Sequence, residues 1–283
     1  MSPKDAKSQL DSLWKTDEWR KFDRLLKKVA IKGRKNVLID IPPVEFLKTN
    51  TILDQLFGGG IRKGQLVELY GSYGSGKTQI CFTLLVESTG LVVYVDSEGT
   101  FSPKRVKEIA AARNKDLNDI NERLLYYQPT DWKEQIAVFH QLPDIENIEL
   151  IIVDSLMAHF RCSKEFIGRQ NLPPRQGLIR THLAELRRIA QQYHAMVVFT
   201  NQISQIPNTM PFTPYYMKEV GVGGPSVHHV PDTLIYLRRI KDPKRIARLI
   251  DSSEVANQEA LFIINEKGVD NLPEEPKEEK GEE

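Results

Sequence analysis

From residue 44 onward, short runs of apolar residues alternate with stretches in which apolar residues recur at helical spacing. The short runs predict β-strands, and the longer stretches predict amphipathic helices. The expected strands are 66–70, 91–95, 124–127, 148–153, 195–200, 233–238, 246–250 and 260–264, and the clearest expected helices are 77–88, 103–113, 131–141 and 174–192. Alternation of this kind is typical of an α/β fold, with a mostly parallel central sheet flanked by helices.

The two ends of the chain follow different patterns. Two amphipathic stretches over 3–30 place apolar side chains on one face and cations on the other, and Ser2-Pro3 is a typical helix start. We therefore expect a small basic helical hairpin and a linker over 1–43, and the α/β domain over 44–270. Residues 274–283 are rich in glutamate and carry no apolar side chain to bury, which predicts an acidic disordered tail over 271–283.

Composition narrows the function classes only a little. The chain has 283 residues, 40% of them hydrophobic, which is enough for one large domain with a buried core. Its formal net charge of +1 favours no class of partner. We find no stretch apolar enough to span a membrane and no signal peptide, and the two cysteines are far apart in sequence. These features predict a cytoplasmic protein without disulfides or a zinc site.

A glycine-rich loop lies between the expected strand 66–70 and the expected helix 77–88. Its residues, Gly71-Ser72-Tyr73-Gly74-Ser75-Gly76-Lys77-Thr78, fit the pattern G-x-x-x-x-G-K-[ST]. Such a loop points backbone N–H groups at phosphates, its lysine reaches the outer phosphates, and its hydroxyl can hold Mg²⁺. The alternative is a glycine-rich turn with an incidental lysine, which the flanking strand and helix disfavour.

Polar residues follow three further strands. Asp96-Ser97-Glu98 follow 91–95, Asp154-Ser155 follow 148–153, and Asn201-Gln202 follow 195–200. The carboxyl ends of parallel strands meet at one edge of a sheet, where ligands bind. Asp154 is then placed as a second metal ligand, through a water, and Glu98 as the group that orients or deprotonates an attacking water. Gln202 is either a sensor of the nucleotide or an amide that only caps its strand.

Two segments have the composition of nucleic-acid contacts. Residues 161–169 combine cations with one aromatic ring, and residues 203–222 form a long apolar and aromatic loop without a clear strand or helix pattern. Binding of single strands without base preference uses phosphate contacts and stacking of this kind. A loop as long as the second is either functional or disordered. The cations over 20–35 are either a solvated helix face or a docking site for DNA or another subunit.

Taken together, these residues resemble the RecA/RadA recombinase family in its archaeal–eukaryotic branch. The resemblance covers about 45–270, and the matching stretches are 71–83, 94–105, 150–161, 168–176, 197–202 and 221–239. It implies a RecA-like P-loop ATPase core that uses ATP and Mg²⁺, forms filaments on single-stranded DNA, and acts in homologous recombination and DNA repair. Duplex DNA is a further implied partner, and the implied place is the nucleoid within the cytoplasm.

The resemblance also assigns roles to single residues. It implies catalytic roles for Lys77, Glu98 and Gln202, and metal binding by Thr78 and Asp154. The implied nucleotide-binding residues are Gly71, Ser72, Tyr73, Gly74, Ser75, Gly76, Lys77, Thr78, Gln79, Arg105, Asp154, His229 and Asp251, of which the last two belong to the interface with a neighbouring subunit. The implied DNA-binding residues are Arg161, Lys164, Arg169, Arg175, Gly223 and Gly224.

Several departures from the family pattern bear on assembly. The Phe-x-x-Ala motif, by which one subunit docks on the next, is absent from the chain, and Ala256 stands where relatives carry a proline. The first loop is longer than usual, and a basic segment replaces the helix-hairpin-helix domain. Residues 101–103 and 129–135 resemble RadB, whereas the loop arginines resemble a full recombinase.

Two functions therefore stay open. The first is a DNA-dependent ATPase that forms a homo-oligomer or filament. The second is a mediator that binds ATP and DNA weakly and modulates another recombinase in a hetero-complex. A RecA-fold regulator or helicase without single-strand loops is disfavoured by Gly168-Arg169 and Gly223-Gly224.

Overall fold

The computed structural model describes residues 45–142, 147–206 and 214–273. The chain divides into two units, Met1–Pro43 and Val44–Glu283, and all described residues belong to the second. The expected basic hairpin and most of the expected acidic tail lie outside the described residues, so the predicted domain boundaries stay predictions. No helix in the described ranges is long and apolar enough to cross a membrane.

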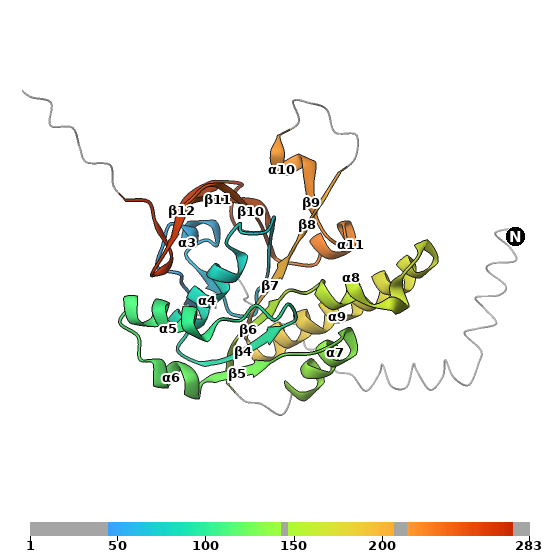
Figure 1. Ribbon diagram of the computed structural model, residues 1–283, viewed down its shortest axis with the longest axis horizontal. Helices are drawn as coiled ribbons and strands as arrows, with labels where there is room; N and C mark the ends of the chain where they lie inside the picture. The colour runs from blue at the N-terminus through green and yellow to red at the C-terminus, as the bar shows by residue number, and fades with distance from the viewer. Residues whose placement is uncertain (1–44, 143–146, 207–213, 274–283) are drawn as a thin grey trace, which may run out of the picture. The chain divides into compact units, whose positions relative to one another are not determined.

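A nine-stranded sheet forms the centre of the second unit, in the order β13-β12-β11-β10-β3-β7-β6-β4-β5 (Figure 1). The strands from β10 to β5 in this order pair in parallel, whereas β10 to β13 form an antiparallel meander. The strands are β3 (Leu66–Gly71), β4 (Leu91–Asp96), β5 (Leu124–Tyr127), β6 (Ile148–Asp154), β7 (Met196–Asn201), β10 (Thr233–Lys241), β11 (Lys244–Ser252), β12 (Glu259–Asn265) and β13 (Gly268–Asn271). The expected α/β fold with a mostly parallel sheet is confirmed; β13 was not among the expected strands.

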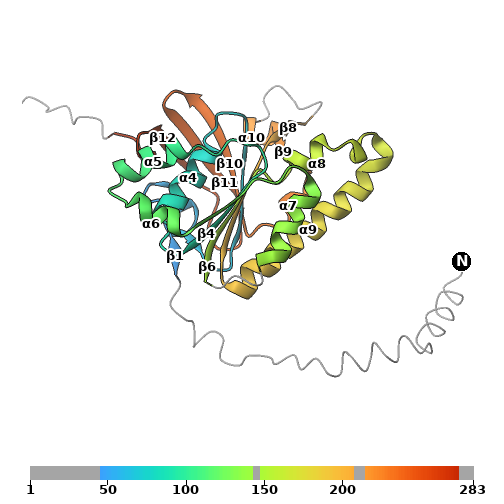
Figure 2. The same ribbon diagram turned by 60° about the horizontal axis from the view of Figure 1, so that its bottom comes forward.

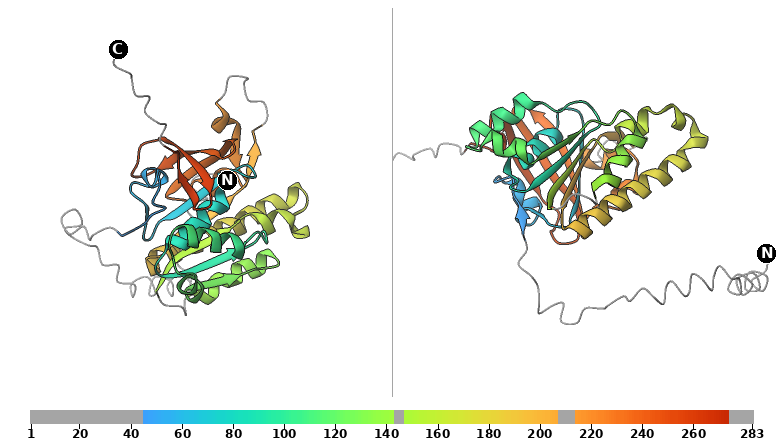
Figure 3. Two further views of the ribbon diagram at one scale, coloured as in Figure 1. Left: turned by 60° about the vertical axis from the view of Figure 1, so that its left-hand side comes forward. Right: turned by 90° about the horizontal axis from the view of Figure 1, so that it is seen from below.

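Helices cover both faces of the sheet, which explains why the central strands are continuous apolar runs. One hydrophobic core joins the sheet to α4 (Lys77–Glu87), α5 (Pro103–Ala112) and α6 (Leu117–Glu122). The other joins it to α7 (Trp132–Gln141) and α9 (Leu172–Tyr193). Figures 2 and 3 show these two groups of helices on opposite sides of the strands, with the long yellow helix α9 running along one face.

The helix ends follow from local chemistry. Ser102 caps α5 by accepting a hydrogen bond from the backbone N–H of Arg105, and Pro103 occupies the first helical position. Asp131 caps α7 by accepting from the N–H groups of Lys133 and Glu134. The expected helix 174–192 begins two residues earlier, because prolines are tolerated in the first turn of a helix. The α5 and α7 caps fix the entry of the chain into the helices beside the sheet edge.

The segments expected to be loops carry short elements. Residues 203–222 contain β8 (Ile203–Gln205), α10 (Tyr215–Lys218) and β9 (Glu219–Gly221), and β8 pairs antiparallel with β9. A local pattern cannot predict this pairing, since each strand is three residues long and finds its partner across the loop. Helix α8 (Ala158–Cys162) ends at Cys162, which is exposed.

Smaller elements complete the description of this unit. The remaining elements are β1 (Phe46–Leu47), α3 (Leu53–Leu56), β2 (Ile61–Arg62), the 3₁₀ turns Lys164–Phe166 and Arg169–Asn171, and α11 (Pro225–His228). The Trp132 ring on α7 packs against Phe160 and Phe166, at centroid distances of 6.0 and 5.5 Å. This aromatic cluster holds α8 and the following turn against α7.

Candidate functional site

A hollow of about 440 Å³ lies at the carboxyl ends of the central strands. We call it the phosphate-loop hollow. Its walls are Tyr73, Gly74, Gly76, Lys77, Thr78, Gln79, Glu98, Thr100, Arg105, Asp154, Gln202, Arg245 and Ile264. All of these were expected at a nucleotide site except Thr100, Arg245 and Ile264. The fold thus brings together polar residues from four separate strand ends, as the parallel topology predicts.

The glycines of the loop meet strict spatial limits. Gly74 and Gly76 have φ values of 72° and 107°, in the left-handed region that glycine adopts at little cost. A Cβ atom at Gly71 would lie 2.1 Å from the carbonyl oxygen of Leu237. The Ser75 hydroxyl is buried and has no hydrogen-bond partner in the described part of the chain. A glycine-rich loop at a helix N-terminus fits an anion, because its backbone N–H groups can point at the ligand.

The Lys77 ammonium lies against its own loop. Its Nζ donates to the carbonyl oxygens of Gly71 and Ser72, at 2.9 and 3.0 Å. Burial lowers the pKa of Lys77, while the negative charges of Asp154 and Glu98 act in the opposite direction. Carbonyl oxygens are weaker partners for an ammonium than phosphate oxygens, because the latter carry full charge. Lys77 can therefore exchange these two hydrogen bonds for contacts with a phosphate.

Asp154 is buried at the end of β6 and is held by three hydroxyl groups. Its Oδ2 accepts from Thr78 Oγ1 at 2.8 Å and from Tyr94 OH at 3.0 Å, and its Oδ1 accepts from Thr200 Oγ1. Burial raises the pKa of Asp154, and the hydrogen bonds from Thr200 and Thr78 oppose this rise. The pair formed by Thr78 and Asp154 supplies the oxygen ligands that Mg²⁺ prefers.

The described residues contain no group of three or more His, Cys, Asp or Glu that could hold a metal ion alone. A magnesium ion at Thr78 and Asp154 would need water and phosphate oxygens to complete its shell. Magnesium in nucleotide sites is held in this way, through few protein ligands. The residues therefore fit Mg²⁺ that arrives with a nucleotide.

Glu98 belongs to a chain of hydrogen bonds that leaves the hollow. Its Oε1 accepts from Ser155 Oγ at 2.5 Å and from Gln202 Nε2 at 3.2 Å. The other end of the same amide, Gln202 Oε1, accepts from Arg161 Nη1 at 2.8 Å. The sequence offered no partner for Glu98, because these contacts join residues far apart in the chain. The polar chain ends in the segment expected to bind DNA.

Two arginines line the phosphate-loop hollow and hydrogen-bond to neighbouring residues of its walls. Arg105 donates through Nε to Gln79 Oε1 at 2.8 Å, and also to the carbonyl oxygen of Asn265. Arg245 donates through Nε to the carbonyl oxygen of Gly74 at 2.9 Å and through Nη2 to Asp242. No local signal marks Arg245 in the sequence, since only the meander brings it to the loop.

A second hollow, of about 480 Å³, lies between α8, the start of α9 and the β8–β9 pair. We call it the arginine–glycine hollow. Its walls are Arg161, Arg175, Ile203, Ser204, Val220, Gly221, Val222, Gly223 and Gly224. Gly223 and Gly224 have φ values of 100° and 60°, and the Arg175 Nε is buried without a hydrogen-bond partner in the described part of the chain. Two guanidinium groups beside a glycine turn form a site for an anion.

The remaining expected site residues lie outside both hollows. Lys164 is exposed in a 3₁₀ turn, and Arg169 begins the next such turn, although its side chain lies outside the description. His229 and Asp251 are exposed and line neither hollow. Their expected roles concern a neighbouring subunit and stay predictions.

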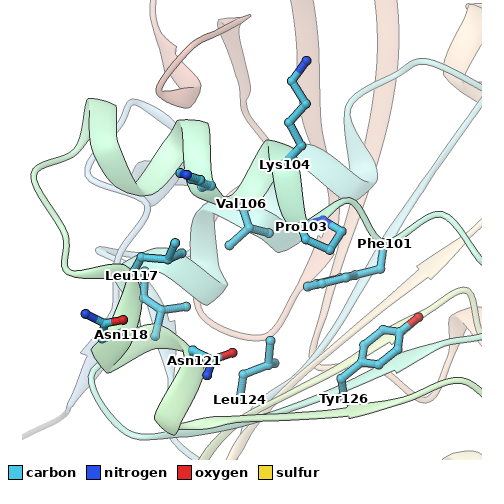
Figure 4. Close-up of a pocket in the computed structure, with 11 residues that line it drawn as sticks. Phe101, Pro103, Lys104, Val106, Leu117, Asn118, Asn121, Leu124 and Tyr126 are labelled. Atoms are coloured by element: carbon cyan, nitrogen blue, oxygen red, sulfur yellow. The ribbon is translucent and has the colours of Figure 1, made fainter.

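A third hollow, of about 710 Å³, is lined mainly by apolar side chains from α5, α6 and β5 (Figure 4). Phe101 and Tyr126 form one wall, with ring centroids 4.9 Å apart, and Tyr126 OH donates to Asp96 at 3.0 Å. None of the expected site residues lines this hollow. It is separate from the polar chain that connects the other two.

Comparison with known proteins agrees with these features. Residues 44–272 match the family model described as Rad51. The chain is 37% identical over 229 residues to the DNA repair and recombination protein RadA of Aeropyrum pernix, covering 77% of this chain and 70% of that protein. It is 34% identical over 230 residues to the protein of the same name from Metallosphaera sedula, covering 77% of this chain and 69% of that protein. The chain therefore belongs to the Rad51 family of RecA/RadA recombinases.

Proposed function

We propose that this protein is an ATPase of DNA repair and recombination whose turnover depends on bound single-stranded DNA. The observation that carries the proposal is the hydrogen-bond chain from Glu98 through Gln202 to Arg161. One end of this chain lines the phosphate-loop hollow and the other lines the arginine–glycine hollow. A single side chain, Gln202, thus contacts residues of both candidate sites.

The negative triphosphate of ATP matches the N–H groups and the Lys77 ammonium of the phosphate-loop hollow. The loop N–H groups would bind phosphate oxygens, and the Lys77 ammonium would turn from the loop carbonyls to the outer phosphates. Thr78 and Asp154 would hold Mg²⁺, which would neutralise charge on the phosphates. Glu98 accepts a proton or a hydrogen bond from the water that attacks. Gln79 and Arg105 line the same hollow and are proposed to contact the base or ribose of the nucleotide.

Single-stranded DNA fits the arginine–glycine hollow. Arg161 and Arg175 provide donors for a backbone phosphate, and the turn Gly221–Gly224 permits close approach of the DNA backbone. These contacts carry no base information, so binding is expected to be independent of sequence and sensitive to salt. Lys164 and Arg169 would extend the same basic track.

Coupling follows from competition for the Gln202 amide. When a phosphate draws Gln202 toward the nucleotide, Arg161 loses its amide partner and becomes available to DNA. Conversely, DNA that engages Arg161 frees Gln202 and changes the environment of Glu98. By linkage, each ligand must alter the affinity for the other by the same factor.

The mediator function remains the second proposal. It is favoured by the absence of the Phe-x-x-Ala motif from the chain, which removes one means of self-assembly. In that case the protein binds ATP, Mg²⁺ and DNA in the same hollows, works in a hetero-complex with another recombinase and turns ATP over slowly. In the first case it forms a homo-oligomer or filament. Cytoplasmic location at the nucleoid is proposed for both.

The deciding experiment measures ATP turnover with and without oligothymidylate, alongside electron microscopy for filaments. We expect turnover to rise on addition of DNA in the native protein, and less so in Arg161→Ala. The control is Arg180→Ala, an exposed arginine on α9 that lines neither hollow. Turnover that is slow and unaffected by DNA, with ATP still bound, would favour the mediator. A protein that binds neither ligand contradicts both proposals.

A further inference from the structure

The strand that leads into the phosphate loop carries a buried carboxylate. Glu68 lies in β3 between apolar neighbours and is fully buried. A buried charge is costly unless hydrogen bonds compensate it. Glu68 Oε1 accepts from Asn201 Nδ2 at 2.9 Å, and Glu68 Oε2 lies 3.0 Å from His228 Nδ1. Its two partners come from the end of β7 and from α11.

The geometry around His228 calls for two N–H groups. Its Nδ1 faces Glu68, and its Nε2 lies 3.2 Å from the carbonyl oxygen of Gly221. A neutral imidazole has a single N–H, whereas an imidazolium has two. With Glu68 as a carboxylate both ring nitrogens face acceptors, and only the imidazolium then satisfies both contacts. Burial lowers the pKa of His228, but the hydrogen bond and the charge of Glu68 outweigh it and raise this pKa above the usual 6.5.

The same cluster holds the wall of the arginine–glycine hollow. Besides contacting Glu68, Asn201 Nδ2 donates to the carbonyl oxygen of Val222 at 2.8 Å, and the N–H of Val222 donates to the carbonyl oxygen of Gln202. A Cβ atom at Gly221 would lie 2.4 Å from His228 Cε1. The carbonyls of two adjacent wall residues are thus anchored, through His228 and Asn201, on one buried carboxylate.

Other ionisable groups lie near the imidazole and have partners of their own. The Tyr70 ring lies 5.0 Å from His228, and burial raises the pKa of Tyr70, so the phenol stays neutral. Tyr236, which packs on Tyr70, donates to Glu219. From α9, Arg187 is paired with Asp232 at 2.9 Å. Glu68 is the charged group that contacts the His228 ring directly.

We propose that His228 is a positioning residue whose imidazolium form, anchored on Glu68, holds the Gly221–Gly224 turn in the shape that binds the DNA backbone. This inference rests on the proposed function, since it assumes that the arginine–glycine hollow binds DNA. Loss of the second proton removes one N–H and leaves a buried acceptor facing a nitrogen lone pair. The turn then loses one of its two anchors, and the hollow loses affinity for phosphate.

The direction with pH follows from linkage. The imidazolium contributes its full stabilisation of the turn below about pH 6.5, the usual pKa, and loses it as pH rises through the higher pKa of the folded state. DNA affinity should fall in the same window, by about tenfold, the size of one hydrogen bond to a charged group. Conversely, bound DNA should raise the pKa of His228 further.

The first test measures binding of fluorescein-labelled oligothymidylate by anisotropy between about pH 5.5 and 8.5, the range in which histidine titrates, at fixed ionic strength. The native protein should show the fall, and His228→Gln should bind more weakly at low pH with a flat profile. The matched control, His140→Gln, changes an exposed histidine on α7 and should keep the native profile.

A second pair of variants tests the contact by steric means. Gly221→Ala should displace the imidazole and weaken DNA binding, whereas Gly177→Ala, at a helical glycine with open space around it, should not. If the buried variants fail to fold, ¹⁵N-histidine spectra of the native protein decide the matter. The His228 ring should titrate above 6.5, and higher with DNA, while His182, whose pKa burial lowers to about 4, should not titrate.

The outcomes separate this inference from the proposed function. If the native protein binds no DNA at any pH, the proposed function fails. If DNA binds but its pH profile is unchanged in His228→Gln, or if His228 titrates below 6.5, DNA binding stands and the role of His228 is overturned.

Discussion

The phosphate-loop hollow and the arginine–glycine hollow both suit anions, but they are built differently. The first lies at the ends of long buried strands, and its loop is shaped by glycines within a single segment of eight residues, 71–78. The second is assembled from α8, α9 and the three-residue strands β8 and β9. Its glycine turn is held by hydrogen bonds to Asn201 and His228, which both contact the buried carboxylate of Glu68. The first rests on strands of the central sheet, and the second depends on a few polar contacts.

This difference in construction suggests that the two hollows have different roles. In the first site the central sheet fixes the backbone of the phosphate loop, and only side chains such as Gln202 respond to the other site. A site held by a few hydrogen bonds can change shape when those bonds change, and switching elements are drawn from such regions of low local stability. We therefore expect changes in the first hollow to abolish chemistry, and changes in the second to adjust affinity.

The largest effect is expected from Lys77→Ala. The ammonium is the mobile charge aimed at the outer phosphates, so its loss should reduce ATP binding and turnover to background. Binding of a fluorescent ATP analogue and phosphate release measure this. The control is Lys104→Ala, an exposed lysine on α5. Normal ATP affinity and turnover in Lys77→Ala would contradict the assignment of the loop.

Glu98→Gln comes next and should separate binding from chemistry. We expect ATP binding to persist and turnover to fall by about 10²-fold or more, the range of a general base. The neutral amide keeps the contacts with Ser155 and Gln202, so the fold should not suffer. Glu122→Gln, at an exposed position of α6, is the control. A collapse of ATP affinity with normal turnover per bound nucleotide would make Glu98 structural.

Gln202→Ala tests the link between the hollows. In the native chain, DNA affinity should differ between ADP and a non-hydrolysable ATP analogue by about 5- to 150-fold, the usual range of coupling between sites. In the variant this difference should shrink, because the polar chain from Glu98 to Arg161 is cut. The exposed Gln205, on β8, offers the control Gln205→Ala. Equal native affinity with both nucleotides would refute the coupling.

The smallest effect is expected from Arg175→Ala. Its guanidinium lines the arginine–glycine hollow and does not belong to the chain through Gln202. DNA affinity should fall by about fivefold, or ~1 kcal/mol, equally for all base sequences. The slope of log affinity against log salt should decrease by about 0.7. A loss that depends on base sequence would show base contact instead.

The sequence predicted the sheet and most of the residues that line the phosphate-loop hollow, because both rest on local patterns. The residues of the apolar runs and of the loop 71–78 are enough to predict strands and a phosphate-binding turn. The parallel topology then places the polar residues after each strand at the same edge of the sheet. Arg245 and Glu68 were missed for the opposite reason. Each is a charged residue within a strand, and its partner, the Gly74 carbonyl or the His228 ring, comes from a distant segment. The β8–β9 pair was missed because strands of three residues have too short a pattern.

The position of Trp132 makes its fluorescence a probe of the first DNA segment. This indole is in contact with Phe160 and Phe166, which flank Arg161 and Lys164, and the Lys133 ammonium lies 5.3 Å from its ring. The chain has three tryptophans, and the other two, Trp14 and Trp19, lie in the first 43 residues. Replacing those two with phenylalanine would leave one emitter beside the first DNA segment. Its wavelength and quenching would then follow the arrival of a nucleic acid in real time, without any added dye.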